Sequence, residues 1–281
     1  MTMTPERASA KAPPEVETLA GGRSRRPDRI PRWIARSLSP IALVALWQVL
    51  ASTGVLSYDV LASPVVVART AADMVADGSL PDAIVASVLR VLAGVVIGGI
   101  TAIVLATLSG LFRVGENIID APVQMLRTVP VLGLIPLLIV WVGIGEEPKV
   151  LLIALAVTFP LYMNLFGGNR NDDSTLVEAS RTLGLGWFGQ VRHVILPSAM
   201  PQFLVGLRYA LGTAWLALVF GETINATSGL GYEMNRAREF YETDVIVVCL
   251  VVYGLLGLIA DLLVRAMEKG LLSWRPAFSG Q

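Results

Sequence analysis

The chain has 281 residues, of which 54% are hydrophobic and 16% are charged, and its mean hydropathy is +0.65. Soluble domains carry about 25% charged residues, so this composition excludes an ordinary water-soluble protein and favours an integral membrane protein. The 22 Lys and Arg residues balance 22 Asp and Glu residues, which leaves no basic surface for a nucleic-acid partner. One cysteine and one histidine exclude an internal disulfide, a cysteine zinc cluster and a His-rich metal site.

Residues 1–36 are polar and rich in Pro and Arg, and we predict a disordered tail there. The first apolar run begins too late for a secretory signal peptide. After the tail, six apolar runs are each long enough to cross the hydrocarbon core as a helix, which takes about 20 residues. We therefore predict an all-α polytopic fold, with residues 37–281 as the transmembrane domain. The predicted spans are residues 37–58, 88–112, 121–145, 150–169, 203–221 and 245–264.

A short amphipathic helix is predicted between the first two spans. Ser63 and Pro64 suit the start of a helix, and Gly78 suits its end. Its alternating apolar and polar residues predict a helix that lies along the outer membrane surface. It is either a plain linker or a contact site for a partner.

Glycine and proline interrupt two of the predicted spans. Gly94 and Gly98 in the second span form a GxxxG pattern, which predicts close packing against another helix. Pro130, Gly133 and Pro136 interrupt the third span. Irregular backbone is tolerated in a membrane where it lines a cavity, so these three residues are candidates for a translocation path. An ordinary proline kink is the alternative.

The connection at residues 170–202 is too long for a simple turn and too patterned for a flexible linker. Ser174 suits the start of a short helix that ends at Gly184. A second short helix is predicted from Trp187 to Val194, just before Pro197. Two short helices joined by glycine form a compact element, which favours docking to another protein.

Charged side chains in the spans need a partner or water, because burial in lipid is costly. Arg208 follows Pro197 by 11 residues, about 16 Å along a helix. It either lines a path, forms a structural ion pair, or extends its charged end toward the membrane surface. Arg90 and Asp261 are a candidate ion pair between helices. Glu222 ends the fifth span, where we expect it to form hydrogen bonds at a helix end or a gate.

The distribution of Lys and Arg predicts the orientation of the spans. If the N-terminus is cytoplasmic, the inside segments hold 15 of these residues and the outside segments hold four. This asymmetry is what the positive-inside rule requires. Both termini are therefore expected in the cytoplasm.

The 170–202 connection carries a spaced motif, in which Glu-Ala-Ser is followed after three residues by Gly and after nine more by Val-x-Leu-Pro. Its positions are Glu178, Ala179, Ser180, Gly184, Val194, Leu196 and Pro197. The motif resembles the EAA loop of ABC importer permeases, which has Ala and Ile where this chain has Ser180 and Val194. The resemblance covers about residues 82–274. Further segments, including the SGLGY run at residues 228–232, resemble the permeases for sulfonates, taurine and nitrate.

This resemblance implies a type I ABC importer permease fold in the bacterial cytoplasmic (inner) membrane. It implies a path for a small anion, such as an aliphatic sulfonate, taurine or nitrate, delivered by an extracytoplasmic solute-binding protein. A neutral or cationic cargo, such as a vitamin or pyrimidine precursor, is the alternative within the family. An ion-coupled secondary transporter is an alternative of another class, which the loop motif disfavours.

The resemblance also implies partners: two ATPase subunits and a second copy of the permease. In such a complex Glu178 makes polar contacts to the ATPase, while Ala179 and Ser180 keep the contact face small. Gly184 permits the turn between the two short helices, and the Leu196-Pro197 pair anchors the return into the membrane. The chain has no GxxxxGK[ST] run, so we expect no catalytic residues, cofactor site or metal site in it, and ATP hydrolysis by the partner.

Overall fold

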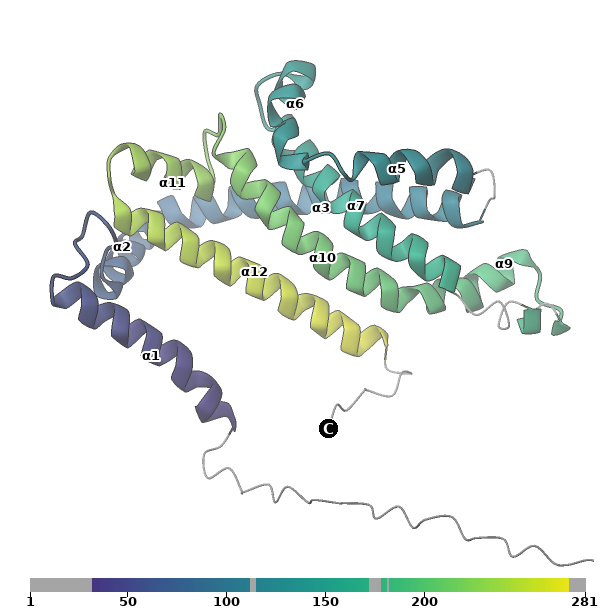
Figure 1. The fold of residues 1–281 in the computed structure, drawn as a ribbon, viewed down its shortest axis with the longest axis horizontal. Coiled ribbons are helices and arrows are strands. Elements are labelled where there is room, and N and C mark those ends of the chain that lie inside the picture. Colours follow the sequence, from purple (N-terminus) through teal and green to yellow (C-terminus); the bar gives the residue numbers. More distant parts are fainter. Residues whose placement is uncertain (1–31, 112–114, 172–177, 181, 273–281) are drawn as a thin grey trace, which may run out of the picture. The chain divides into compact units, whose positions relative to one another are not determined.

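The structure is a computed structural model that describes residues 32–111, 115–171, 178–180 and 182–272, and every regular element in these ranges is a helix (Figure 1). The chain divides into two compact units, residues 1–45 and 46–281. Helix α1 (Arg32–Ser52) begins in the first unit and ends in the second. It starts five residues before the predicted boundary of the tail. The rest of that tail, residues 1–31, lies outside the described residues.

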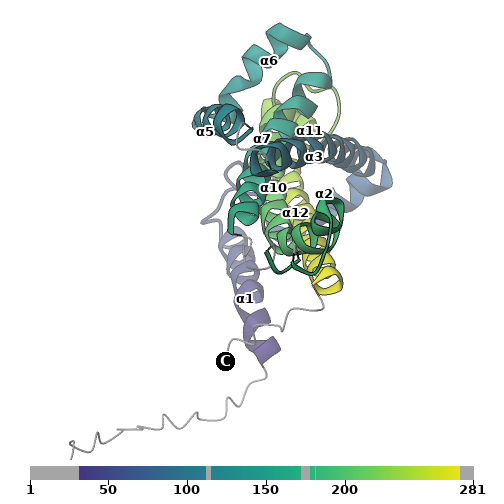
Figure 2. The same cartoon turned by 90° about the vertical axis from the view of Figure 1, so that its right-hand side faces the viewer.

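Four long helices dominate the second unit, and α7 is the central one (Figures 1 and 2). In its apolar part, 56% of the residues are buried, against 28% in α3 and 22% in α12. Leu152, Ile153 and Val157 of α7 have no exposed surface. Helix α7 therefore packs between α3 and α10 as the core of the unit. The bounds are α3 (Ser79–Leu111), α7 (Glu147–Asn171), α10 (Leu196–Glu222) and α12 (Thr243–Leu271).

Two glycines bring α3 close to α7. A Cβ atom at Gly94 would collide with the side chain of Ile153, and one at Gly98 would collide with the backbone of Ala154. The Thr158 hydroxyl also lies 3.2 Å from the carbonyl oxygen of Gly98. The close packing predicted from the GxxxG pattern is therefore confirmed, and the partner helix belongs to the same chain.

The third predicted span is divided into several short helices. Helix α5 (Ala121–Leu126) follows the π-helical turn η1 (Glu116–Asp120), and α6 (Ile135–Val142) follows the 3-10 turn η2 (Val131–Leu134). The two parts are bent by 86° at the break. Pro130 is extended there, with φ −66° and ψ 99°, so the helix stops instead of continuing with a kink.

The predicted count of six spans is not confirmed by these helices. Among the described residues, four helices are long and apolar enough to cross a membrane, and the bent pair makes a fifth if it is one span. The apolar part of α1, Leu38–Ser52, is shorter than the about 20 residues that a perpendicular helix needs. Six spans therefore stay a prediction.

Two short helices lie at one end of the unit, α2 (Pro64–Ala76) and α11 (Leu230–Glu239) (Figure 1). Helix α2 has the predicted cap, because the Ser63 hydroxyl accepts a hydrogen bond from the backbone N–H of Val66. The Thr70 hydroxyl donates to Asp244 at 2.6 Å, which ties α2 to the start of α12. The predicted surface helix is therefore confirmed as a helix.

Candidate functional site

The described residues of the predicted docking element lie at the N-terminal end of α10. We call residues 178–197 the 178–197 segment. Glu178 and Ala179 are exposed in a short helical stretch, and Ser180 beside them is buried. Ser174, the predicted start of this helix, lies outside the described residues. Leu183, Trp187 and Phe188 all expose large apolar side chains on the same segment.

Gly184 turns the chain between the two halves of this segment. Its φ is +80°, in the left-handed region that costs an L-residue about 1–2 kcal/mol. A Cβ atom there would meet nothing within 4 Å, so the requirement for glycine is conformational and not steric. The turn predicted at this glycine is present in the structure.

The second half of the segment is continuous with the membrane helix, which differs from the prediction of a separate short helix. Helix α9 (Trp187–Gln190) and the π-helical turn η3 (Val191–Ile195) run directly into α10, giving one helix of 36 residues. Pro197 lies in the first turn of α10, and the wider turn η3 before it accommodates the missing N–H group. The Ser198 hydroxyl donates to the carbonyl oxygen of Val194 at 2.7 Å, within the same helical stretch. Helices α9 and α10 therefore form one uninterrupted helical stretch.

Arg208 forms ion pairs with α12 instead of standing free in a path. Its Nε atom lies 3.1 Å from Oδ1 of Asp261, and its Nη2 atom lies 2.7 Å from Oε2 of Glu268. Asp261 also accepts a hydrogen bond from Arg265 at 2.7 Å. The predicted pair of Arg90 with Asp261 is wrong, because Arg90 pairs with Glu146 and Glu222, whereas Asp261 pairs with Arg208.

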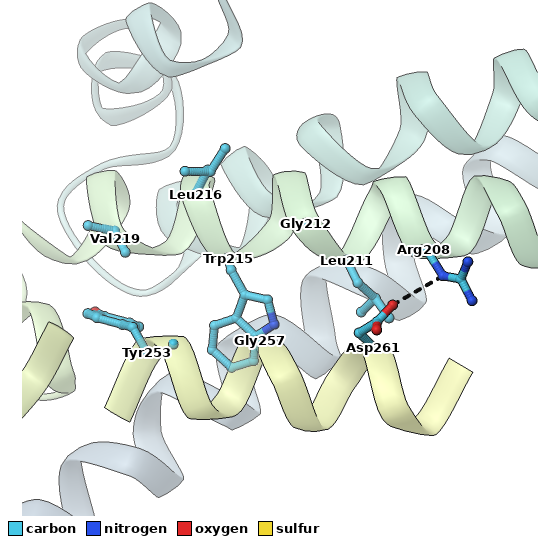
Figure 3. A pocket seen from close by; sticks show the side chains of 10 residues that line it. Arg208, Leu211, Gly212, Trp215, Leu216, Val219, Tyr253, Gly257 and Asp261 are labelled. Carbon is cyan, nitrogen blue, oxygen red and sulfur yellow. Dashed lines mark ion pairs between the residues drawn. The ribbon is translucent and has the colours of Figure 1, made fainter. Parts of the chain in front are cut away.

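A pocket of about 380 Å³ lies between α10 and α12 beside this ion pair (Figure 3). Figure 3 shows Arg208 and Asp261 at one end, Trp215 in the middle and Tyr253 toward the other end. Gly212 and Gly257 leave space in its walls, and the lining is mostly apolar. The pocket is an apolar cavity with one neutralised charge pair at its end.

The other three predicted path residues do not join Arg208. Pro130, Gly133 and Pro136 are exposed at the bend between α5 and α6. Pro136 lies in the first turn of α6, where proline starts a helix without strain. Within the described chain none of the three lines the 380 Å³ pocket. The structure therefore shows the interruption but does not assemble the predicted set.

The opposite end of α10 carries a buried polar network that the sequence did not reveal. We call it the Arg90–Glu222 cluster. The Glu222 side chain has no exposed surface, and the Arg90 side chain is 5% exposed. Arg90 Nη1 donates to Glu222 Oε1 at 2.5 Å. The other donors to the Glu222 carboxylate are the Ser87 hydroxyl at 2.7 Å, the Tyr253 hydroxyl at 2.8 Å and the Gly231 N–H at 2.8 Å.

The outer face of the cluster is formed by a second carboxylate, Glu146, in the connection before α7. Arg90 donates to both of its oxygens, through Nε to Oε2 and through Nη2 to Oε1, the second at 3.0 Å. Lys149 Nζ lies 2.9 Å from Oε1. The hydrogen bonds from Arg90, and secondarily those from Lys149, hold the pKa of Glu146 below its usual range.

Ser228 and two following glycines complete the cluster. Arg90 Nη1 donates to the Ser228 carbonyl oxygen at 2.8 Å, and Nη2 donates to its hydroxyl at 2.9 Å. A Cβ atom at Gly229 would collide with both Arg90 and Glu222, and one at Gly231 would collide with Glu222. The SGLGY run therefore passes over the ion pair because its glycines leave room. The hydrogen bonding expected of Glu222 is confirmed, although its partners were not foreseen.

Comparison with known proteins gives relatives over most of the chain. The sequence profile of the family "Binding-protein-dependent transport system inner membrane component" matches residues 94–273. An aliphatic sulfonates transport permease protein of Escherichia coli (strain K12), named SsuC, is 44% identical over 252 residues, which cover 89% of this chain and 96% of that one. The Bacillus subtilis (strain 168) protein of the same name is 38% identical and covers 88% of this chain and 90% of its own. The taurine transport system permease protein TauC of E. coli is 34% identical over 70% of this chain and 72% of its own.

The structural comparison finds an inward facing structure of the MetNI methionine ABC transporter. It is 21% identical, with a TM-score of 0.47, and the match covers 64% of this chain and 90% of that chain.

Proposed function

The chain belongs to the family of binding-protein-dependent transport system inner membrane components, and from this premise we propose that it forms the membrane path of an ATP-driven importer for aliphatic sulfonates or taurine. The observation that carries the substrate class is the 44% identity to an aliphatic sulfonates permease over 89% of the chain. As an ABC transporter permease it is a transport component, and the chain lacks a phosphate-binding GxxxxGK[ST] run. ATP hydrolysis is therefore assigned to a partner subunit.

The 178–197 segment is the proposed docking site for that ATPase. Exposed Leu183, Trp187 and Phe188 offer apolar contact area, and the nearby Glu178 offers a charge. Large apolar side chains of this kind are typical anchors of a protein interface. The continuous helix from Trp187 to Glu222 supports a direct mechanical link, because a rigid element carries motion over its whole length.

In the proposed assembly, two copies of the chain bind two ATPase subunits, and a solute-binding protein delivers the cargo. The 178–197 segment faces the cytoplasm, together with both termini, and the Arg90–Glu222 cluster faces outward. The excess of Lys and Arg in the inside segments supports this orientation. A reporter that is active only outside the cytoplasm should work when fused at Gly54 and fail when fused at the C-terminus.

The test of the function is uptake by the assembled transporter. The chain, its ATPase and its solute-binding protein are reconstituted in vesicles, and uptake of labelled taurine and ethanesulfonate is measured with and without ATP. We expect ATP-dependent uptake of both, and slower uptake of nitrate and of a neutral pyrimidine. Preference for the pyrimidine would overturn the substrate class. Uptake driven by an ion gradient without ATP would overturn the importer mechanism.

A further inference from the structure

An open groove of about 480 Å³ lies against the Arg90–Glu222 cluster, on the side that Glu146 occupies. Its polar lining is Arg90, Glu146, Thr227 and Ser228. Leu89 and Ala93, from the same helix as Arg90, give it an apolar wall. The groove thus places a charged centre next to a short apolar surface, and no part of the 178–197 segment or of the 380 Å³ pocket contributes to it.

The two carboxylates bound by Arg90 differ sharply. Glu222 is fully buried and accepts hydrogen bonds from α3, α11 and α12, so its removal from Arg90 would leave a buried charge. The Glu146 side chain is 52% exposed and comes from a connection between helices. Its ion-pair partners among the described residues are the two cations Arg90 and Lys149. Of the two carboxylates, Glu146 is therefore the one that can leave Arg90 and become hydrated at the lower cost.

The net charge of the cluster indicates which kind of ligand can replace Glu146. With it, Arg90 and Lys149 are balanced by Glu146 and Glu222, and the cluster is neutral. When Glu146 turns into solvent, one positive charge is left over at the groove. The guanidinium edge that Glu146 bound through two nitrogens then faces an open space, and such an edge prefers an anion with two oxygens side by side.

We propose that this groove binds an aliphatic sulfonate, and that Glu146 occupies the place of the sulfonate group until a ligand displaces it. The choice of ligand rests on the proposed function. Two sulfonate oxygens take the bonds of the Glu146 carboxylate, and the Ser228 hydroxyl, whose hydrogen is not used in accepting from Arg90, donates to the third. Leu89 and Ala93 receive the aliphatic chain.

Exchange of this kind avoids the main cost of an anion site on a buried arginine. Arg90 is desolvated already in the free protein, because Glu146 and Glu222 cover it. The incoming sulfonate therefore replaces one set of charge-assisted hydrogen bonds with another, while Glu146 regains water. The apolar contacts of the chain and the hydration of Glu146 favour the exchange, so affinity is expected to rise with the length of the aliphatic chain.

The test measures binding of 1-hexanesulfonate to the purified complex of this chain with its ATPase, by titration calorimetry at pH 7. Glu146→Gln removes the competing charge and keeps the shape, and we expect it to bind 1-hexanesulfonate about 10-fold tighter than the wild type does. The matched control is Arg238→Gln, an exposed arginine at the same end of the molecule, which should bind like the wild type. 1-Hexanol and hexyltrimethylammonium should show no gain from Glu146→Gln.

A second variant keeps the proposal testable without touching the ion pairs. Ala93→Leu narrows the apolar wall, and we expect it to weaken 1-hexanesulfonate binding about 10-fold while ethanesulfonate binding changes less than twofold. Equal affinity of the wild type, Glu146→Gln and Ala93→Leu for 1-hexanesulfonate would overturn the site.

The outcome for this site and the outcome for the proposed function are separable. If the transporter imports sulfonates but the two variants bind 1-hexanesulfonate like the wild type, the site is wrong and the function stands. If both variants behave as expected but the transporter imports no sulfonate, the anion site stands and the assigned cargo is wrong.

Discussion

The two ends of α10 differ in what contacts their side chains. At the 178–197 segment, Leu183, Phe188 and Leu196 are exposed, and the segment presents apolar surface to its surroundings. At the other end, Glu222 is fully buried and accepts hydrogen bonds from three other helices of the same chain. The polar groups at one end are thus bonded within the chain. The other end exposes large apolar side chains, as surfaces that bind a second protein do.

The difference matters because a single helix joins the two ends. Helix α10 has 27 residues, about 40 Å at 1.5 Å per residue, and it is continuous with α9. Movement of α9 by a docked protein would therefore reach Glu222, and through it Arg90 and Tyr253. Through the hydrogen bonds of the buried cluster, α3, α11 and α12 would move together with α10.

The largest effect is expected when the buried end is broken. Arg90→Ala leaves the Glu222 carboxylate buried without its cation, and loss of one partner of a buried ion pair costs about 3–5 kcal/mol. Thermal unfolding of the purified chain, followed by circular dichroism, should shift to clearly lower temperature. Arg238→Ala, at an exposed position of α11, should change stability by less than about 0.5 kcal/mol. Similar unfolding temperatures for both variants would show that the cluster does not hold this end together.

The next effect is expected at the exposed end. Glu178→Lys reverses the charge of the proposed docking surface, and we expect a loss of a few kcal/mol in ATPase affinity. The stability of the chain should not change, because Glu178 is exposed. Co-purification of the ATPase and ATP-dependent uptake measure this loss. Thr182→Ala is the control on the same short helix, since its hydroxyl donates to the carbonyl oxygen of Ala179 in the same turn, at 2.8 Å. Normal ATPase binding by Glu178→Lys would contradict the assignment of the docking surface to this segment.

A smaller effect is expected from the turn that joins the halves of the segment. Gly184→Val places a β-branched residue at φ +80°, at a local cost of about 1–2 kcal/mol. We expect normal membrane insertion but weaker ATPase association and uptake. Gly184→Asn should retain most of the uptake, because Asn tolerates the left-handed region. If Val and Asn act alike, the glycine is not needed for its backbone conformation.

The smallest effect is expected from Glu146 and concerns pH. The pKa of Glu146 is lower in the folded protein than in the unfolded chain, so its ion pairs stabilise the fold above about pH 4.3, the usual Glu value. This stabilisation is lost as the pH falls through the lowered folded value. The Glu146 side chain is half exposed, so solvent screening limits it to less than about 1 kcal/mol. The difference in unfolding temperature between wild type and Glu146→Gln should therefore shrink between pH 6 and pH 3.5. If this difference stays constant over that pH range, the ionisation of Glu146 does not stabilise the fold.

Pro130 and Pro197 show that the same local sequence signal can have two structural outcomes. The sequence predicted that a short helix ends just before Pro197 and that the third span is interrupted at Pro130. The chain bends by 86° at the break that contains Pro130, whereas the helix continues through Pro197 after a π-helical turn. The residue type is the same in both places. The outcome depends on whether the neighbouring turn widens enough to accommodate the missing N–H group.

The amino-acid sequence by itself determined the membrane class, the presence of the long apolar helices, the close packing at Gly94 and the turn at Gly184. It did not determine the ends of these helices, because α3 begins nine residues before the predicted span and α12 ends seven residues after its span. The features that it determined depend on composition, on hydropathy and on the backbone freedom of single residues, which are local properties. Only the tertiary structure decided that Arg90 binds Glu146 and Glu222 and that Asp261 binds Arg208. Such pairs join helices that are far apart in the chain, and they depend on how each helix is rotated and how deeply it is buried. Hydropathy says that a charge in a span needs a partner, but packing selects which one.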